Sequence, residues 1–176
     1  MKFLNMIFMK INNLLKKIAP LFLIFAALTT GCAKSDDDTY HDMLLDGVAS
    51  LNLGKAEKAL REFNAAINFN PRKYGGYLGR GNAFNTLGRY NEAIRDYNRA
   101  LSIDTGIANA YVNRGIARVR LREYKKAVAD FEKGLELDPE IDDPPGFMQR
   151  LFDDVSNKDK GIRKLLDQLK KKLESE

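Results

Sequence analysis

Cysteine and histidine are almost missing from this sequence, which holds only Cys32 and His41. A disulfide within the chain would need a second cysteine, so none can form. A structural zinc site takes about four Cys or His ligands, so that class of metal site is excluded as well. A Ser/His/Asp arrangement would have to use His41, which we expect to be an exposed residue in the first turn of a helix. No metal and no cofactor are therefore predicted.

A Gly-rich phosphate loop is also missing. Gly75, Gly76, Gly79 and Gly81 lie close together, but no strand precedes them and no Lys-Ser/Thr pair follows, as a phosphate-binding loop would require. The carboxylates are spread at helix-surface spacings, and no two stand out as an acid/base pair. We therefore predict no catalytic residues and a binding protein, not an enzyme.

The net charge of +5 is concentrated in the first residues. Lys2, Lys10, Lys16 and Lys17 account for four of these charges, because residues 1–31 contain no acid. The rest of the chain is close to neutral at +1 and has no concentrated basic face, which a nucleic-acid-binding protein would need. Nucleic acid is therefore not an expected partner.

Internal similarity is the dominant feature of the remaining sequence. Segment 74–107 matches segment 108–141 after a shift of 34 residues, and segment 40–73 is a weaker copy. A fixed period of this size indicates a repeat array. The recurring pairs include Tyr77 and Tyr111, Gly81 and Gly115, Tyr90 and Tyr124, Ala93 and Ala127, and Tyr97 and Phe131.

Each copy has the pattern of two helices joined by a short turn. Ala93, Tyr97 and Ala100 are four and three residues apart, so they share one helical face. Gly54 and Gly88 stand where a left-handed helix end favours glycine. Neither helix can bury its apolar face alone, so the copies must stack. Helices are expected at 40–53, 56–69, 74–87, 90–103, 108–121 and 123–137.

These residues resemble the tetratricopeptide repeat. The second copy meets the family's order of aromatic and small residues with Tyr77, Gly81, Phe84, Gly88, Tyr90, Ala93, Tyr97 and Ala100. It departs at Thr105, where the family has proline. The third copy has Arg118, Arg122 and Gly134 where the family prefers an aromatic residue, glycine and alanine, and the first has Met43 and Ser50 for aromatics.

The expected fold class is therefore all-α: an α-solenoid of three such helical hairpins, at 40–73, 74–107 and 108–141, plus a C-terminal pair of capping helices in 142–176. An array needs a cover on its open end. Residues 147–155 and 162–173 supply two apolar stripes. A membrane-surface role for the lysine-rich second stripe is an alternative.

Arginine and aspartate recur together in the second and third copies. Arg80 precedes Asp96 by sixteen residues, and Arg114 precedes Asp130 by the same distance, whereas the first copy lacks both partners. We expect Arg–Asp pairs that join the two helices of a repeat or neighbouring repeats; the alternative is unrelated surface charges.

The resemblance implies a concave groove lined by the first helix of each repeat, which receives a peptide or protein partner. Amide side chains there could bond a peptide backbone; the alternative is a solvated helix surface. The subfamily that clamps a chaperone's terminal carboxylate uses Lys, Asn, Asn, Lys and Arg. This chain has Leu44, Val48, Gly79, Asn109 and Asn113 instead, so that ligand is not expected. The predicted groove residues are Leu44, Val48, Leu78, Asn82, Asn85, Asn109, Val112, Asn113, Ile116 and Arg120.

Residues 1–31 have the layout of a secretory signal peptide. A basic segment, 1–17, is followed by the uncharged apolar run 18–30, which is shorter than the roughly 20 residues of a membrane span. Gly31-Cys32 resembles the end of the lipobox of bacterial lipoproteins, although Thr29 stands where Leu is usual. The resemblance implies cleavage before Cys32 and acylation of that residue; the alternative is an ordinary signal peptide with an incidental cysteine.

Residues 32–39 are then a lipidated cysteine followed by an acidic tether. Ala33 is not the Asp associated with inner-membrane retention, so the resemblance implies an outer-membrane lipoprotein of a bacterial envelope, on the periplasmic face or the cell surface. Ser35 to Asp38 resembles an export signal of surface-displayed lipoproteins; the alternative is a solvated tether that also supplies acids to the next helix.

Two functions remain open from the sequence. The first is an envelope-anchored adaptor without catalytic activity, which holds a partner peptide or protein in its groove. The second is a structural or surface-displayed lipoprotein that binds an extracellular ligand.

The anchor can be tested at the cysteine. If Cys32 carries the acyl chains, a Cys32→Ser protein should leave the detergent-rich membrane fraction, because two or more chains are what make anchoring stable. Cell fractionation followed by immunoblotting measures this. Partitioning of the variant with the parent would contradict lipidation.

Overall fold

The computed structural model describes residues 34–141 and 161–175. All regular structure in this part of the chain is helical, as predicted. Contacts divide the chain into two units, Met1–Asp36 and Asp37–Glu176, and the packing described below is that of the second unit. Its helices are α2 (Asp36–Asn52), α3 (Ala56–Phe69), α4 (Tyr74–Thr86), α5 (Tyr90–Ile103), α6 (Ala108–Arg120), α7 (Tyr124–Leu137) and α9 (Ile162–Glu174).

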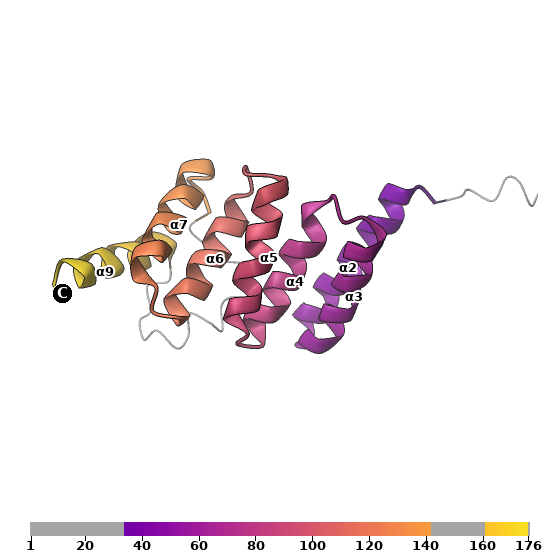
Figure 1. The fold of residues 1–176 in the computed structure, drawn as a ribbon, viewed down its shortest axis with the longest axis horizontal. Helices are drawn as coiled ribbons and strands as arrows, with labels where there is room; N and C mark the ends of the chain where they lie inside the picture. The colour runs from indigo at the N-terminus through magenta and orange to yellow at the C-terminus, as the bar shows by residue number, and fades with distance from the viewer. Residues whose placement is uncertain (1–33, 142–160, 176) are drawn as a thin grey trace, which may run out of the picture. The chain divides into compact units, whose positions relative to one another are not determined.

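The helices pack in the order in which they occur along the chain (Figure 1). α4 and α5 form one hairpin and α6 and α7 the next, while α3 packs on α4 and α5 packs on α6. Five helices begin within one residue of their predicted start. The first begins earlier than predicted, at Asp36, so the acidic end of the predicted tether forms a first helical turn. Carboxylates are favourable there because they face the positive end of the helix dipole.

An aromatic ring pressed against a glycine holds each hairpin together. A Cβ atom on Gly47 would lie 2.5 Å from Phe63, one on Gly81 would lie 2.7 Å from Tyr97, and one on Gly115 would lie 2.7 Å from Phe131. All three rings are buried. The glycine is therefore required by close approach, and the 34-residue period of the sequence is the period of this contact.

The predicted Arg–Asp pairs are present and connect more than one hairpin. Arg80 donates two hydrogen bonds of 2.7 Å to Asp96 in its own hairpin. It donates a third, of 2.6 Å, to Asn64 on α3 of the preceding hairpin. The hydrogen bond from Arg80 to Asp96 raises the pKa of Arg80, so the guanidinium stays charged. Each arginine thus joins three helices.

The same arrangement recurs one repeat later. Arg114 donates to Asp130 at 2.7 Å and to Asn98 on α5 at 2.6 Å. Arg118, which stands where the family prefers an aromatic residue, donates to the same Asp130 at 2.7 Å. We call these contacts the arginine ladder: Arg80 with Asp96 and Asn64, and Arg114 with Asp130 and Asn98.

Helix α9 covers the end of the array. Ile162, Leu166 and Leu169 are buried in one cluster with Val112 and Phe131. The lysines of this helix are partly engaged by the protein itself: Lys170 lies 2.8 Å from Glu132, and Lys172 lies over the ring of Tyr124. The predicted capping role of 162–173 is therefore confirmed, while its predicted partner, 147–155, lies outside the described residues.

The turn inside the third hairpin is strained, unlike the equivalent turns in the first two. Gly54 and Gly88 have φ angles of 72° and 73°, as predicted for left-handed helix ends. Arg122 occupies the same place in the third copy with a φ of 59°. For a residue with a Cβ atom this conformation costs about 1–2 kcal/mol.

Replacing Arg122 with glycine should therefore stabilise the protein. The relief of strain exceeds the roughly 0.5–1 kcal/mol that glycine's chain entropy costs, so we expect a net gain of about 0.5–1 kcal/mol in the free energy of unfolding. Urea unfolding followed by circular dichroism measures it. Gly88→Ala is the matched control and should lose about 1 kcal/mol; a loss for Arg122→Gly as well would show that the turn is not strained.

Candidate functional site

The ten predicted groove residues differ widely in exposure. Val48 and Asn109 are exposed, and Leu44, Leu78, Asn82 and Arg120 are half-buried. The other four, Asn85, Val112, Asn113 and Ile116, are buried. Because these four side chains are buried, they cannot contact a partner directly in this conformation. Whether a partner binds the remaining six stays a prediction.

Two of the predicted amides bind each other. Asn113 on α6 donates from Nδ2 to Oδ1 of Asn82 on α4 at 2.8 Å, and the Tyr97 hydroxyl donates to the same oxygen at 2.9 Å. Burial raises the pKa of Tyr97 well above its usual value, so the hydroxyl keeps its proton. Asn82 and Asn113 were expected to bond a peptide backbone, but they join the second hairpin to the third.

The apolar part of the predicted groove is also occupied. Val112 and Ile116 pack with Phe131 and with Ile162 and Leu166 of α9. A Cβ atom on Gly134 would lie 2.7 Å from Val112, so α7 approaches this side of α6 closely. The periodic pattern predicted that this side of α6 lines an open groove. It did not show that α7 and α9 cover this side.

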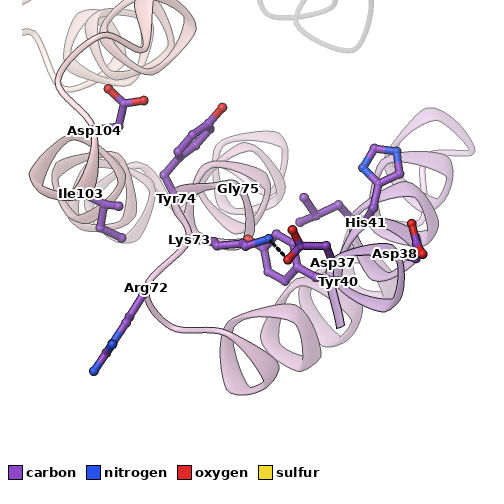
Figure 2. Close-up of a pocket in the computed structure, with 11 residues that line it drawn as sticks. Asp37, Asp38, Tyr40, His41, Arg72, Lys73, Tyr74, Gly75, Ile103 and Asp104 are labelled. Atoms are coloured by element: carbon purple, nitrogen blue, oxygen red, sulfur yellow. Dashed lines mark hydrogen bonds and ion pairs between the residues drawn. The ribbon is translucent and has the colours of Figure 1, made fainter. Parts of the chain in front are cut away.

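An open hollow of about 800 Å³ lies beside the first two hairpins, and only Leu44 of the predicted groove residues lines it. Its walls come from the start of α2, the turn between α3 and α4, the start of α4 and the end of α5 (Figure 2). The lining residues are Asp37, Asp38, Tyr40, His41, Leu44, Arg72, Lys73, Tyr74, Gly75, Ile103 and Asp104.

One side of the hollow is held rigidly by Tyr40. Its hydroxyl accepts a hydrogen bond from the backbone N–H of Gly76 at 2.8 Å, which fixes α2 against α4. Burial raises the pKa of Tyr40, and the bond from Gly76 only partly opposes this. Lys73 lies 4.9 Å above the Tyr40 ring and 2.6 Å from Asp37. A dashed line in Figure 2 marks the ion pair between Lys73 and Asp37.

Glycine at position 75 makes this close packing possible. A Cβ atom there would lie 2.8 Å from Leu44 and 3.2 Å from the Tyr40 hydroxyl. Tyr74, beside it, keeps 40% of its surface exposed. A large aromatic side chain that is exposed next to an apolar wall is a common anchor for a bound segment.

The sequence reasoning missed this hollow because it considered only one face of each first helix. Arg72 and Lys73 belong to the turn between hairpins, Tyr74 begins α4, and Asp104 follows α5. A signal was present: Tyr74 and Lys73 stand beside the Gly75–Gly76 pair, whose two residues have no side chain of their own.

Two further features bear on function. In residues 34–141 and 161–175, no three His, Cys, Asp or Glu side chains gather in a way that could hold a metal ion. The helices within these ranges are each too short or too polar to cross a membrane. The predicted lipidation site, Cys32, and the signal peptide lie outside the described residues.

Helical hairpins that repeat with period 34 and pack an aromatic ring against glycine define a solenoid of tetratricopeptide type. The family model described as "TPR repeat" matches residues 81–121, and that described as "Tetratricopeptide repeat" matches residues 108–141. Residues 81–141 therefore carry tetratricopeptide repeats. No curated protein matches it in sequence.

Solved structures share the fold. The Arabidopsis OM64 TPR domain is 28% identical, covers 69% of this chain with 97% of its own, and has a TM-score of 0.58. The second TPR of Spaghetti (RPAP3), bound to the HSP90 peptide SRMEEVD, is 26% identical over 56% of this chain and 92% of its own, with a TM-score of 0.55. The Sgt2 TPR domain of Aspergillus fumigatus, at 22% identity over 77% of this chain and 80% of its own, has a TM-score of 0.60 and shows the fold alone.

The buried ring and its hydroxyl can be tested separately at Tyr97. We expect Tyr97→Ala to cost about 3–5 kcal/mol of unfolding free energy, as other large aromatic truncations in cores do. Tyr97→Phe should cost only about 0.5–1.5 kcal/mol, the net contribution of a hydrogen bond. Chemical denaturation measures both. An unfolding midpoint equal to the parent's for Tyr97→Ala would contradict the repeat register.

Proposed function

We propose that this protein is an adaptor without catalytic activity, which binds an extended segment of a partner protein in the hollow beside α2, α4 and the end of α5. The hollow itself carries the proposal. Its volume of about 800 Å³ is within the roughly 300–1,000 Å³ of typical ligand sites. A related TPR structure bound to an HSP90 peptide supports a peptide ligand.

The lining offers both apolar and polar contacts. Leu44, Ile103 and the Tyr74 ring can receive an apolar side chain. His41 and Arg72 also line the hollow, and their N–H groups can donate hydrogen bonds to a backbone carbonyl. An extended segment exposes its side chains and its backbone together, so it can use both kinds of contact.

The charges of the hollow favour a segment without many carboxylates. Asp37, Asp38 and Asp104 face two cations, Arg72 and Lys73, and Lys73 is already paired with Asp37. Like charges brought together oppose binding. We therefore propose a neutral or basic partner segment, unlike the acidic SRMEEVD peptide of the related structure.

We also propose that the adaptor is held in a bacterial envelope by acyl chains on Cys32. The Gly31-Cys32 pair after an uncharged run supports this proposal. The run Asp36 to Asp38 has a role in the folded protein, because it forms the first turn of α2 and Asp37 pairs with Lys73. That role supports the tether interpretation of the acidic run over an export signal, and with it the adaptor over the surface-displayed alternative.

Site-specific photocrosslinking in cells tests the adaptor. A photoreactive amino acid in place of Tyr74 should crosslink a discrete partner, while one in place of Lys126 should not, because Lys126 lies on α7, well outside the hollow. The crosslinked segment, made as a peptide, should bind the Tyr74→Ala protein about tenfold more weakly than the parent, a loss of about 1.4 kcal/mol. Crosslinks from position 126 alone, or equal affinity for the Tyr74→Ala protein, would contradict the site.

A further inference from the structure

Inside the array, each first helix has one face covered by the second helix of the preceding hairpin. On α4 this face contains Gly79, Ala83 and Leu87. Gly79 contacts the ring of Phe63 on α3. Ala83 and Leu87 belong to one cluster with Leu60 and the same ring. The covering element is thus a helix that runs alongside the face.

The equivalent face of α6 is covered in the same way. Asn113 and Ala117 are buried there, and Ala117 packs in a cluster with Tyr97 of α5. Leu121, the third member, is half-buried. In two copies of the repeat, therefore, this face is covered by a neighbouring helix.

In the first repeat the same three positions are Leu45 and Ala49 on α2 and Leu53 directly after it, which we call the end face. Leu45 is 52% exposed and Leu53 is 69% exposed, and Ala49 is exposed as well. Within residues 34–141 and 161–175, no helix packs against the end face. An apolar stripe four residues apart along a helix is a surface that another helix can cover.

The charges beside the end face differ from those in the other repeats. Asp46 stands where the arginine ladder has Arg80, and Glu62 stands where it has Asp96. Two carboxylates therefore replace an Arg–Asp pair. Lys58 contacts one oxygen of Glu62 at 3.2 Å. The other oxygen, Oε2, is buried and has no hydrogen-bond partner. A buried acceptor without a donor is costly, so this place favours an incoming cation.

We propose that the end face is a docking site for an amphipathic helix of a partner protein, and that an arginine or lysine of that helix enters beside Asp46 and Glu62. The helix takes the place that α3 has against α4. Its residue opposite Leu45 must leave room for the leucine side chain; on α4 the Phe63 ring fits closely because it lies against Gly79. This surface is distinct from the hollow.

A second copy of this chain does not meet these requirements. Its last hairpin could approach the end face only with α7, and α9 already covers part of α7. At the position of Asn64 and Asn98, α7 has Glu132, which is paired with Lys170. A glutamate there would add a third carboxylate to Asp46 and Glu62, and like charges oppose association. The charges of Asp46 and Glu62 therefore favour a separate basic helix as the occupant.

A peptide based on the chain's own α3 makes a defined probe. It contains residues 55–70 with Phe63→Ala, which provides space for Leu45, and Asn64→Arg, which provides the cation. A lactam between Glu57 and the side chain of an Arg61→Lys change keeps it helical, since both positions are exposed in α3 and four residues apart. The control peptide carries Asn64→Glu instead. Fluorescence anisotropy measures the binding of each labelled peptide to the full chain.

We expect the arginine peptide to bind about tenfold more tightly than the glutamate peptide. Asp46→Lys in the full chain should remove or reverse this preference. Leu45→Gln combined with Leu53→Gln should weaken binding of both peptides, whereas Tyr74→Ala, in the hollow, should leave it unchanged.

Several results would overturn the proposal. These are no binding of either peptide, equal binding of the two, or binding that the Leu45 and Leu53 changes do not affect. Sedimentation of the full chain tests the other possible occupant, a second copy of this chain. A concentration-dependent dimer that the same leucine changes abolish would mean that a second copy occupies the end face. Loss of partner crosslinks in the hollow, with peptide docking intact, would count against the adaptor site alone.

Discussion

The contact between an aromatic ring and a glycine is the constraint on which this structure depends. Phe63, Tyr97 and Phe131 each fill the space that a missing Cβ atom leaves on the facing helix. Any side chain at the glycine would push the two helices of a hairpin apart, and the next hairpin would lose its support. Burial of the rings supplies the hydrophobic stabilisation, and glycine decides how closely the helices approach.

The fold followed from the sequence because this contact repeats. Period 34 identified the hairpins and their turns, and the spacing of Arg80 and Asp96 identified the ladder. The binding site was predicted less well from the sequence. A helical pattern tells which face of a helix is apolar, but not which neighbour covers it. Val112 and Ile116 were predicted to line an open groove, and they are covered by α9. The hollow is lined in part by the turn between the first two hairpins, and the repeat pattern did not indicate it.

Departures from the repeat are where the protein's own properties lie. Leu45, Asp46 and Glu62 in the first copy give an end face and an acidic position that the other copies lack. Tyr74, beside two glycines, gives an exposed ring at the hollow. Residues that follow the repeat hold the array together. Residues that break it are therefore the first to examine for binding.

The two junctions between hairpins are both held by directed hydrogen bonds as well as by apolar contact. At the first junction Arg80 donates to Asn64, and at the second Arg114 donates to Asn98. Such bonds have strict geometry. In a linear array, each junction sets how strongly neighbouring units unfold together. The three hairpins should therefore open as one cooperative unit.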